Sequence, residues 1–378
     1  MAVGIICEYN PFHNGHIYHL NKVKEIAKDE PIVLVMSGNF TQRGNISIIE
    51  KYDKAKIALD YGVDLVIELP FQYATQSSDF FAKGAINILN ELKCNKLVFG
   101  SESNNVDELI NLANIQINNK EYDNLVKEEL DKGINYPTAM SNALKRITKN
   151  TITTPNDLLG LSYIKEIIKN KYKIEPITIK RTNDYNSKEL TRNIDSATSI
   201  REALKNNIDV SNSIPKESLK YINKFNEEKY LDILKYKIIS TNDLSIYQTV
   251  DEGIDNKLKQ VINEVNTIDE LILKVKSKRY TYNKINRMLN HIICSYTKEE
   301  NKNNNELKYI KVLGFSSKGK KYLNSIKKET NTPIITNINK NNIDIQELEL
   351  RTDQIYNLIM SRNNNLYANK PIIKDIVK

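Results

Sequence analysis

Short apolar runs alternate with segments of helical periodicity along the first half of the chain. The apolar runs cover residues 2–6, 31–36, 64–70, 96–100 and 174–179, and helical periodicity is clear over about 17–27, 49–61 and 77–92. Strands that are apolar throughout and alternate with helices indicate a parallel sheet covered on both faces. The pattern therefore predicts an α/β fold built on a doubly wound parallel sheet.

The pattern changes twice. Residues 106–150 are helical and polar, which suggests an insertion or a cap over the sheet, and a further helix is expected just after Thr154, with Asn156 or Asp157 as its cap. Beyond about residue 207 the alternation stops, and the chain reads as mostly helical with Asn-rich loops. Since 378 residues exceed one typical core, we expect a first domain over 1–206 and a mainly α-helical second domain over 207–378.

Composition excludes several classes of protein. With 40% hydrophobic and 27% charged residues the chain is typical of soluble globular proteins. It shows no signal-peptide pattern and no apolar stretch of membrane-spanning length, so we expect no membrane contact and a cytoplasmic location. Three widely separated cysteines offer neither a disulfide framework nor a CxxC metal site. The net charge of +8 favours polyanionic partners; the oligomeric state stays open.

The most unusual feature is a cluster of histidines directly after the first apolar run. His13, His16 and His19 are three of only four histidines in the chain. They follow a Pro-containing turn and come where a helix is expected to open, near Asn14. A helix N-terminus attracts phosphate, and His13 and His16, three residues apart, share one face. Gly15 between them lets a nucleotide approach the backbone.

Two other interpretations of the histidines remain. Imidazoles at helical spacing can bind zinc, but no Cys or carboxylate at a matching offset completes a tetrahedral set, so we expect no metal site. The histidines could also simply fill a turn. His19 fits a structural role better than a catalytic one.

Polar loops follow each predicted strand at the edge where ligands bind in doubly wound sheets. They include residues 37–44, 68–70 and 100–103, although turn chemistry alone could explain any one of them. Gly100 is a better binding candidate than Gly44, because it stands where a strand ends and a base could pass close to its backbone. After the fifth strand, Ser196, Thr198 and Arg201 offer hydroxyls and a guanidinium for phosphate oxygens. Ser or Thr here could equally be a helix cap.

The second region carries a basic segment interleaved with tyrosine. It contains Lys276, Lys278, Arg279, Tyr280 and Arg287. Basic groups contact phosphates and tyrosines stack on unpaired bases, so we expect these five residues to bind RNA, with the arginines as the stronger candidates. A solvated helix face would explain the lysines as well. Lys318, Lys320 and Lys321 are expected to extend the patch.

The two motifs His13-Asn14-Gly15-His16 and Ser196-Ala197-Thr198-Ser199-Ile200-Arg201 resemble those that bracket ATP in the His-x-Gly-His nucleotidyltransferase superfamily. Longer segments, at residues 4–16, 36–40, 68–70, 78–82 and 278–281, are similar to the bacterial tRNA(Met) cytidine acetate ligase family, and the similarity extends over essentially the whole chain. One departure is Cys7, where an aliphatic residue is more usual.

The resemblance implies ATP-dependent acetylation of the wobble cytidine of elongator tRNA(Met), from acetate through acetyl-adenylate, with Mg²⁺ accompanying ATP. It implies that His13, His16 and Arg201 are catalytic. The residues that it assigns to ATP are Cys7, Glu8, Tyr9, Asn10, Pro11, Phe12, His13, Asn14, Gly15, His16, Ile17, Tyr18, His19, Leu20, Gly100, Asn156 and Arg181. We add Ser196 and Thr198 on the grounds given above.

Two other functions remain open on the sequence alone. A small-molecule nucleotidyltransferase that adenylates a cofactor precursor would share the histidine motif, but it has no evident need for a large basic second region. A non-catalytic RNA-binding protein with a relic nucleotide pocket is the other, and the intact His13 and His16 speak against it.

Overall fold

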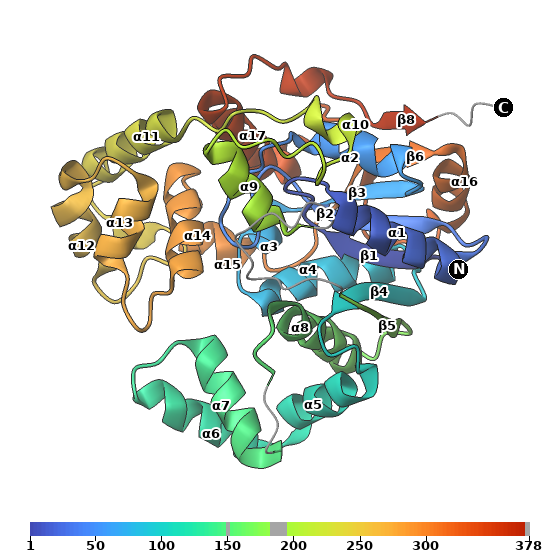
Figure 1. Ribbon diagram of the computed structural model, residues 1–378, viewed down its shortest axis with the longest axis horizontal. Coiled ribbons are helices and arrows are strands. Elements are labelled where there is room, and N and C mark those ends of the chain that lie inside the picture. The colour runs from blue at the N-terminus through green and yellow to red at the C-terminus, as the bar shows by residue number, and fades with distance from the viewer. Residues whose placement is uncertain (149–151, 182–194, 375–378) are drawn as a thin grey trace.

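A computed structural model of the chain describes residues 1–148, 152–181 and 195–374, and its centre is one mixed sheet (Figure 1). The strands are β1 (Val3–Cys7), β2 (Ile32–Ser37), β3 (Leu65–Leu69), β4 (Lys96–Ser101), β5 (Glu175–Lys180), β6 (Ile310–Ser316), β7 (Ile334–Ile335) and β8 (Ile372–Lys374). They lie in the order β5-β4-β1-β2-β3-β6-β7, and β8 also pairs with β6.

The first five strands are parallel, which confirms the predicted doubly wound sheet. From β1 the chain proceeds to β2 and β3 on one side and then to β4 and β5 on the other. The direction of winding thus reverses beside β1. A crevice opens at such a switch point, beyond the carboxyl ends of the strands, so the site is expected where β1 and β4 end.

Helices cover both faces of the sheet, and β2 shows why its sequence is apolar throughout. Val33 and Val35 pack with α4 (Ser78–Glu91), α5 (Val106–Asn118) and α8 (Pro155–Lys169) in one core. Leu34 and Met36 face the other way and pack with α1 (Asn14–Ala27) and α2 (Lys51–Asp60). Both sets of side chains are fully buried. The short α3 (Phe71–Ala74) directly precedes α4.

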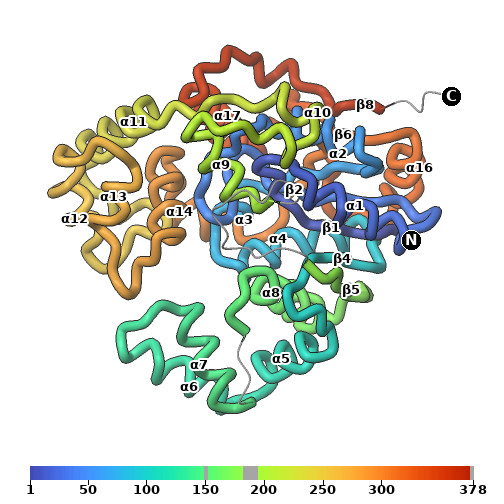
Figure 2. Tube along the Cα trace, in the orientation of Figure 1, coloured from blue at the N-terminus to red at the C-terminus, as the bar shows by residue number. Residues whose placement is uncertain are grey.

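The predicted insertion is a group of three helices below the sheet in Figures 1 and 2. It consists of α5, whose apolar side joins the core beside α8, and of α6 (Lys120–Asp131) and α7 (Tyr136–Thr148), which pack on each other. The expected end of the insertion at residue 150 lies outside the described residues.

A second group of helices lies on the other side of the switch point, at the left in Figures 1 and 2. It comprises α11 (Glu227–Ser240), α12 (Ile254–Val261), α13 (Ile268–Val275), α14 (Tyr282–Ile293) and α15 (Lys298–Asn303). We call residues 226–303 the helical lobe. Its core includes Leu234, Leu271 and Leu289, together with Phe40 and Phe71 from the sheet domain. Helices α9 (Ala197–Lys205) and α10 (Lys216–Leu219) precede it.

The expected helical domain over 207–378 needs correction, because the chain returns to the sheet after the lobe. β6 pairs with β3 in antiparallel fashion, and α16 (Ser317–Ile326) buries Tyr322 and Ile326 in the sheet core. β6 escaped the sequence-based prediction because its seven residues stand between polar loops, with no second apolar run nearby. The alternation of apolar strands and helices that revealed the first five strands is therefore absent around β6.

The last helix, α17 (Glu347–Ile359), is tied to the sheet by a buried ion triad. Lys51 on α2 contacts Glu68 of β3 at 2.8 Å and also contacts Asp353 of α17. Burial alone would lower the pKa of Lys51, but the two carboxylates more than offset it and raise that pKa well above its usual value. Three segments far apart in sequence are thereby locked together.

Candidate nucleotide-binding active site

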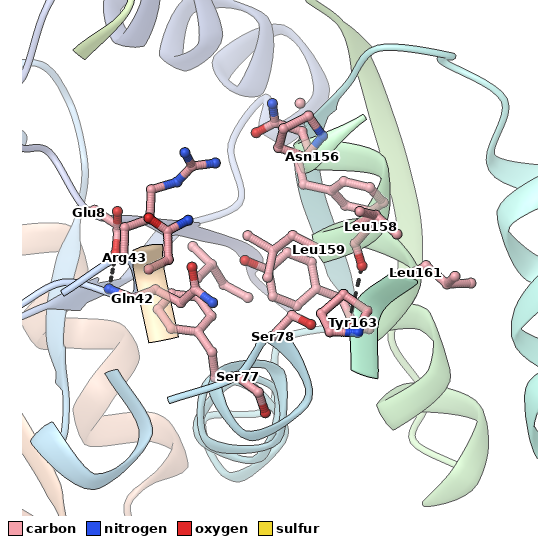
Figure 3. A pocket seen from close by; sticks show the side chains of 18 of the residues that line it. Glu8, Gln42, Arg43, Ser77, Ser78, Asn156, Leu158, Leu159, Leu161 and Tyr163 are labelled. Atoms are coloured by element: carbon pink, nitrogen blue, oxygen red, sulfur yellow. Dashed lines mark hydrogen bonds between the residues drawn. The ribbon is translucent and has the colours of Figure 1, made fainter. Parts of the chain in front are cut away.

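A cavity of about 680 Å³ opens at the switch point and is the candidate site. Its wall combines the end of β1, the start of α1, the loop after β2, the start of α4, helices α7 and α8 and the start of α9, and residues of the helical lobe. Figure 3 shows Glu8, Gln42 and Arg43 on one side of it and Asn156 with Leu158 on another. The sheet domain, the insertion and the lobe thus share one cavity.

His13 and His16 form the start of α1. His13 is the N-cap residue, and its Nδ1 accepts a hydrogen bond from the backbone N–H of Gly15 at 3.1 Å. His16 is the third helical residue, and its Nδ1 accepts from the backbone N–H of His13 at 3.2 Å. This is a capping box made of imidazoles instead of Ser and Glu. The helix begins at Asn14, as predicted, and the two ring centroids are 3.9 Å apart.

The capping bonds fix the tautomer of both rings. Because each Nδ1 accepts a hydrogen bond, the proton of the neutral imidazole is on Nε2. Burial, with Arg181 and Arg201 nearby, lowers the pKa of His13 to about 3. Burial and the neighbouring His13 hold the pKa of His16 well below its usual value. Both rings are therefore neutral near pH 7, and each presents one N–H donor.

Arg201 of α9 lies near His13, where its charge, together with burial, helps to lower the pKa of that histidine. Its Nη1 donates to the carbonyl of Asn10 at 2.6 Å, and its Nη2 donates to Thr198 Oγ1 at 3.3 Å. The guanidinium thus bridges α9 and the loop after β1. Ser196 caps α9 by accepting from the backbone N–H of Ser199 at 3.0 Å, which bears out the capping interpretation for this residue. All three predicted residues of this motif also line the cavity.

Helix α8 differs from its prediction in one detail. It is capped at Thr154 and begins with Pro155, so neither Asn156 nor Asp157 is the cap. Proline suits the first helical position. The carboxylate of Asp157 instead accepts from the backbone N–H of Ser103 at 2.9 Å and so holds the end of β4. Asn156 donates to Glu102 and lines the cavity.

Gly100 keeps the end of β4 open for an arginine. A Cβ at this position would come within 3.3 Å of Arg181 Cγ, so a larger residue would press on the Arg181 side chain that lies against the strand. Both residues line the cavity.

Some residues of the long motif after β1 line the cavity, and the others support those that do. Its lining residues are Cys7, Glu8, Tyr9, Asn10, His13, Gly15, His16, Tyr18 and His19. Pro11, Phe12, Asn14, Ile17 and Leu20 do not line the cavity; Phe12 and Leu20 are core residues below it, and Asn14 donates to the carbonyl of Asn212. Burial raises the pKa of the Cys7 thiol to about 12, so this thiol is no nucleophile.

The basic segment of the lobe contributes only part of its predicted set to the cavity. Arg279 and Arg287 line it, whereas Lys276 and Lys278 are exposed outside it. Tyr280 corrects the stacking prediction: its ring is buried, its hydroxyl accepts from the backbone N–H of Asp251 at 3.0 Å, and Lys284 Nζ lies 3.8 Å from its ring centroid. A ring covered in this way supports the fold and offers no face to a base.

The lysines after β6 also differ from their prediction. Lys318 contacts the carbonyl of Glu30 at 3.0 Å and the carboxylate of Asp64 at 3.5 Å. These two residues stand at the amino ends of β2 and β3, so Lys318 lies at the edge of the sheet opposite the cavity and cannot extend the basic patch there.

Several lining residues escaped the sequence-based prediction. They are Gln42, Arg43, Asn45, Ser77, Ser78, Tyr136, Asn283 and Lys284, among others. Gln42, Arg43, Asn45 and Ser77 lie in loops and look like ordinary turn residues, whereas the other four lie in α4, α7 and α14. The sequence pattern placed residues 37–44 at the ligand-binding edge but did not single out Gln42 or Arg43.

The described residues contain no group of three or more His, Cys, Asp or Glu side chains placed to hold a metal ion. None of the described helices is long and apolar enough to cross a membrane.

A doubly wound sheet with an imidazole-capped helix at its switch point defines a nucleotidyltransferase, and the chain belongs to that class: the model of the HIGH Nucleotidyl Transferase family matches residues 1–370. Within the class, the chain belongs to the family of tRNA(Met) cytidine acetate ligases. Proteins of that name from Geobacillus sp. (strain WCH70) and Clostridium acetobutylicum are 37% and 38% identical to it. The matches cover 99% and 98% of this chain and 100% and 99% of the relatives.

Solved structures agree with this assignment. TmcAL of Thermotoga maritima, in its apo form, is 30% identical to the chain and superimposes with a TM-score of 0.91. The same protein bound with α-thio ATP gives a TM-score of 0.88. Both comparisons cover all of this chain and all of the other.

Proposed function

We propose that this protein acetylates the wobble cytidine of elongator tRNA(Met) to N4-acetylcytidine, with acetate and ATP as cosubstrates and acetyl-adenylate as the intermediate. The observation that carries the proposal is the shared cavity: neutral imidazole donors at a helix N-terminus and two arginines of the helical lobe, Arg279 and Arg287, face the same space. A nucleotide and an RNA base can therefore meet there. The names of the relatives and the ATP analogue bound by the Thermotoga maritima protein support the same conclusion.

ATP is proposed to lie over the start of α1, with its phosphates toward His13, His16, Arg181 and Arg201. The first N–H groups of α1 and the helix dipole favour negative charge there. The adenosine would extend toward Gly100 and Asn156, at the end of β4 and the start of α8, and Ser196 and Thr198 would border the nucleotide from α9. All eight residues line the cavity.

In the first step an acetate oxygen attacks the α-phosphorus of ATP, and the bond from that phosphorus to the bridging oxygen breaks. Pyrophosphate leaves with the electron pair of the broken bond. Charge grows on the phosphoryl oxygens, so catalysis consists of positioning and electrostatic stabilisation. The Nε2–H groups of His13 and His16 donate to these oxygens, and Arg201 adds a fixed positive charge. No covalent nucleophile on the protein is needed.

Mg²⁺ is proposed to enter with ATP. Since the described residues offer no ready-made cluster of ligands, phosphate oxygens would supply most of its coordination, as is common for this ion.

In the second step the 4-amino group of cytidine takes the acetyl group and AMP leaves. The anticodon is proposed to reach the cavity along the helical lobe, past Arg279, Lys284 and Arg287, with Lys276 and Lys278 contacting phosphates further out. Unpaired anticodon bases can leave their stack without breaking a duplex. With a tRNA substrate, the proposed location of the enzyme is the cytoplasm.

Adenylation of a small cofactor precursor is not favoured. The relatives that match over their full length are named as tRNA-modifying ligases, and the lobe contributes arginines to the cavity wall that a small substrate would not require.

The test is nucleoside mass spectrometry of elongator tRNA(Met) incubated with the protein, ATP and labelled acetate. We expect labelled N4-acetylcytidine at the wobble position, together with acetate-dependent exchange of label between pyrophosphate and ATP. The proposal fails if no acetylcytidine forms while another carboxylic acid supports the exchange.

A further inference from the structure

The cavity is strongly basic, which makes its few carboxylates informative. Five arginines and two lysines line it: Arg43, Lys180, Arg181, Arg201, Arg279, Lys284 and Arg287. Among the described residues, only Glu8 and Asp79 bring carboxylates to the wall. Asp79 is paired with Lys165 at 2.6 Å. Glu8 forms no ion pair with any described residue, although it stands among so many cations.

Glu8 is held in place by one strong hydrogen bond. It directly follows β1, and its Oε1 accepts from the backbone N–H of Gln42 at 2.6 Å (Figure 3). The hydroxyl of Ser37 lies at 3.5 Å from the same oxygen. No hydrogen bond from a described residue reaches Oε2. The side chain is therefore oriented by the protein and keeps one oxygen for a ligand.

The same peptide of Gln42 connects Glu8 to the helical lobe. The carbonyl of Gln42 accepts from Arg287 Nη1 at 3.0 Å, and Arg287 lies on α14. The next residues of this loop are fixed to α14 as well, because Asn286 donates to the carbonyl of Arg43 at 3.1 Å. Glu8 thus stands at the part of the cavity that a nucleotide entering along the lobe would reach.

The chemistry of a carboxylate limits what can bind there. A triphosphate is repelled by it and belongs over the histidines, on the cationic side. A neutral donor is attracted, and among pyrimidines the exocyclic amine of cytosine is a donor where uracil has an acceptor oxygen. Acceptance of the cytosine 4-amino group is a known use of Glu and Asp in base recognition.

We propose, on the basis of the function inferred above, that Glu8 is the catalytic residue that receives the 4-amino group of the target cytidine. Oε2 accepts a hydrogen bond from the amine and so selects cytosine over uracil. In the transfer step the amine nitrogen forms a bond to the acetyl carbon, and the bond between that carbon and the phosphate oxygen breaks. AMP leaves with the electron pair of that bond, and one amine proton passes to Glu8.

The test compares Glu8→Gln with Glu8→Asp in three measurements. Glutamine keeps an oxygen for the Gln42 N–H but cannot take a proton, and aspartate keeps the carboxylate at shorter reach. Adenylation is measured as acetate-dependent ATP–pyrophosphate exchange, RNA binding as the Kd for elongator tRNA(Met), and acetyl transfer as a single turnover from preformed acetyl-adenylate. Asp79→Asn removes the other carboxylate of the wall and serves as the matched control.

For Glu8→Gln we expect acetyl transfer to fall by roughly 10²–10⁴-fold, the range for loss of a general base, while exchange changes far less. Glu8→Asp should recover part of the transfer rate, and Asp79→Asn should lose little of it. The inference is overturned if ATP–pyrophosphate exchange falls as much as acetyl transfer in Glu8→Gln, or if exchange in this variant requires a higher Mg²⁺ concentration. Either result would mean that Glu8 acts in binding or activating ATP. If wild-type protein adenylates acetate but makes no acetylcytidine, the proposed function itself fails.

Discussion

The two ring nitrogens of His16 are assigned different roles, one in capping the helix and one in binding phosphate, and substitutions at this position can test each role separately. Nδ1 caps α1 by accepting from the N–H of His13 at 3.2 Å, and Nε2 is left to donate to phosphate. The side-chain oxygen of asparagine falls near the position of Nδ1, whereas the side-chain amide of glutamine extends to the position of Nε2. His16→Asn therefore keeps the cap and removes the phosphate donor. His16→Gln keeps a donor near the position of Nε2, and its side-chain oxygen can also serve as the capping acceptor. His16→Ala removes both groups.

The magnitudes of the two effects differ. Loss of an N-terminal capping acceptor costs about 1 kcal/mol of unfolding free energy. Loss of a donor aimed at developing charge in a buried site costs on the order of 10²–10³-fold in rate, or about 2.7–4 kcal/mol. We expect His16→Asn to lose about that factor in adenylation with a nearly unchanged unfolding free energy. His16→Gln should adenylate faster than His16→Asn, and His16→Ala should be about 1 kcal/mol less stable than His16→Asn.

Acetate-dependent ATP–pyrophosphate exchange measures the first quantity and urea denaturation the second. His16→Ala, which lacks both groups, should show both losses at once. A His16→Asn protein more active than His16→Gln would refute the assignment of the donor to Nε2. Equal stabilities of His16→Asn and His16→Ala would refute the capping role.

Three further predictions follow from burial and charge. Because burial keeps the imidazoles of the site neutral in the folded protein, the unfolded chain binds more protons below about pH 6.5. The free energy of unfolding, measured by urea denaturation, should therefore fall from pH 6.5 to 5, by at most about 1.4 kcal/mol per pH unit for each imidazole. Adenylation should require no protonated histidine. Lys51→Met should lower the free energy of unfolding by about 3–5 kcal/mol, because it leaves the two carboxylates of the ion triad unpaired. These carboxyl groups would then hold protons in the folded state, so the loss of stability should grow from pH 5 to 8. A loss under about 1 kcal/mol, the value expected for the exposed Lys56→Met, would contradict this prediction. Arg279→Ala should weaken tRNA binding and reduce the dependence of that binding on salt concentration, without altering the KM for ATP. A changed KM for ATP with unchanged tRNA binding would contradict the assignment of Arg279 to the tRNA.

The sequence predicted the parallel half of the sheet well because each of its strands is buried on both faces and therefore apolar throughout. It also placed the start of α1 correctly, since a turn containing Pro11 and a polar residue at the cap are local signals. The cap itself was less expected: His13 takes the place of Ser or Asp, and only the structure shows which nitrogen is used.

What the sequence could not predict depends on contacts between distant segments. β6 adds to the sheet next to β3 although 240 residues separate Leu69 from Ile310, and no local pattern encodes such pairing. Tyr280 looked like a stacking residue because composition does not reveal that Lys284 covers its ring. The role of the insertion was open, and Tyr136 now places it on the cavity wall.

The pairing of β6 with β3 has a consequence for how the protein can be divided. A chain that stopped at residue 206 would leave the mostly apolar strand β3 unpaired on one side, and unpaired edge strands promote aggregation. It would also strip the lobe from Phe40 and Phe71, which are 2% and 5% exposed in the intact chain. We therefore expect that the sheet domain and the helical lobe cannot be expressed as two independent pieces. The chain passes from one to the other and back, and each covers apolar side chains of the other.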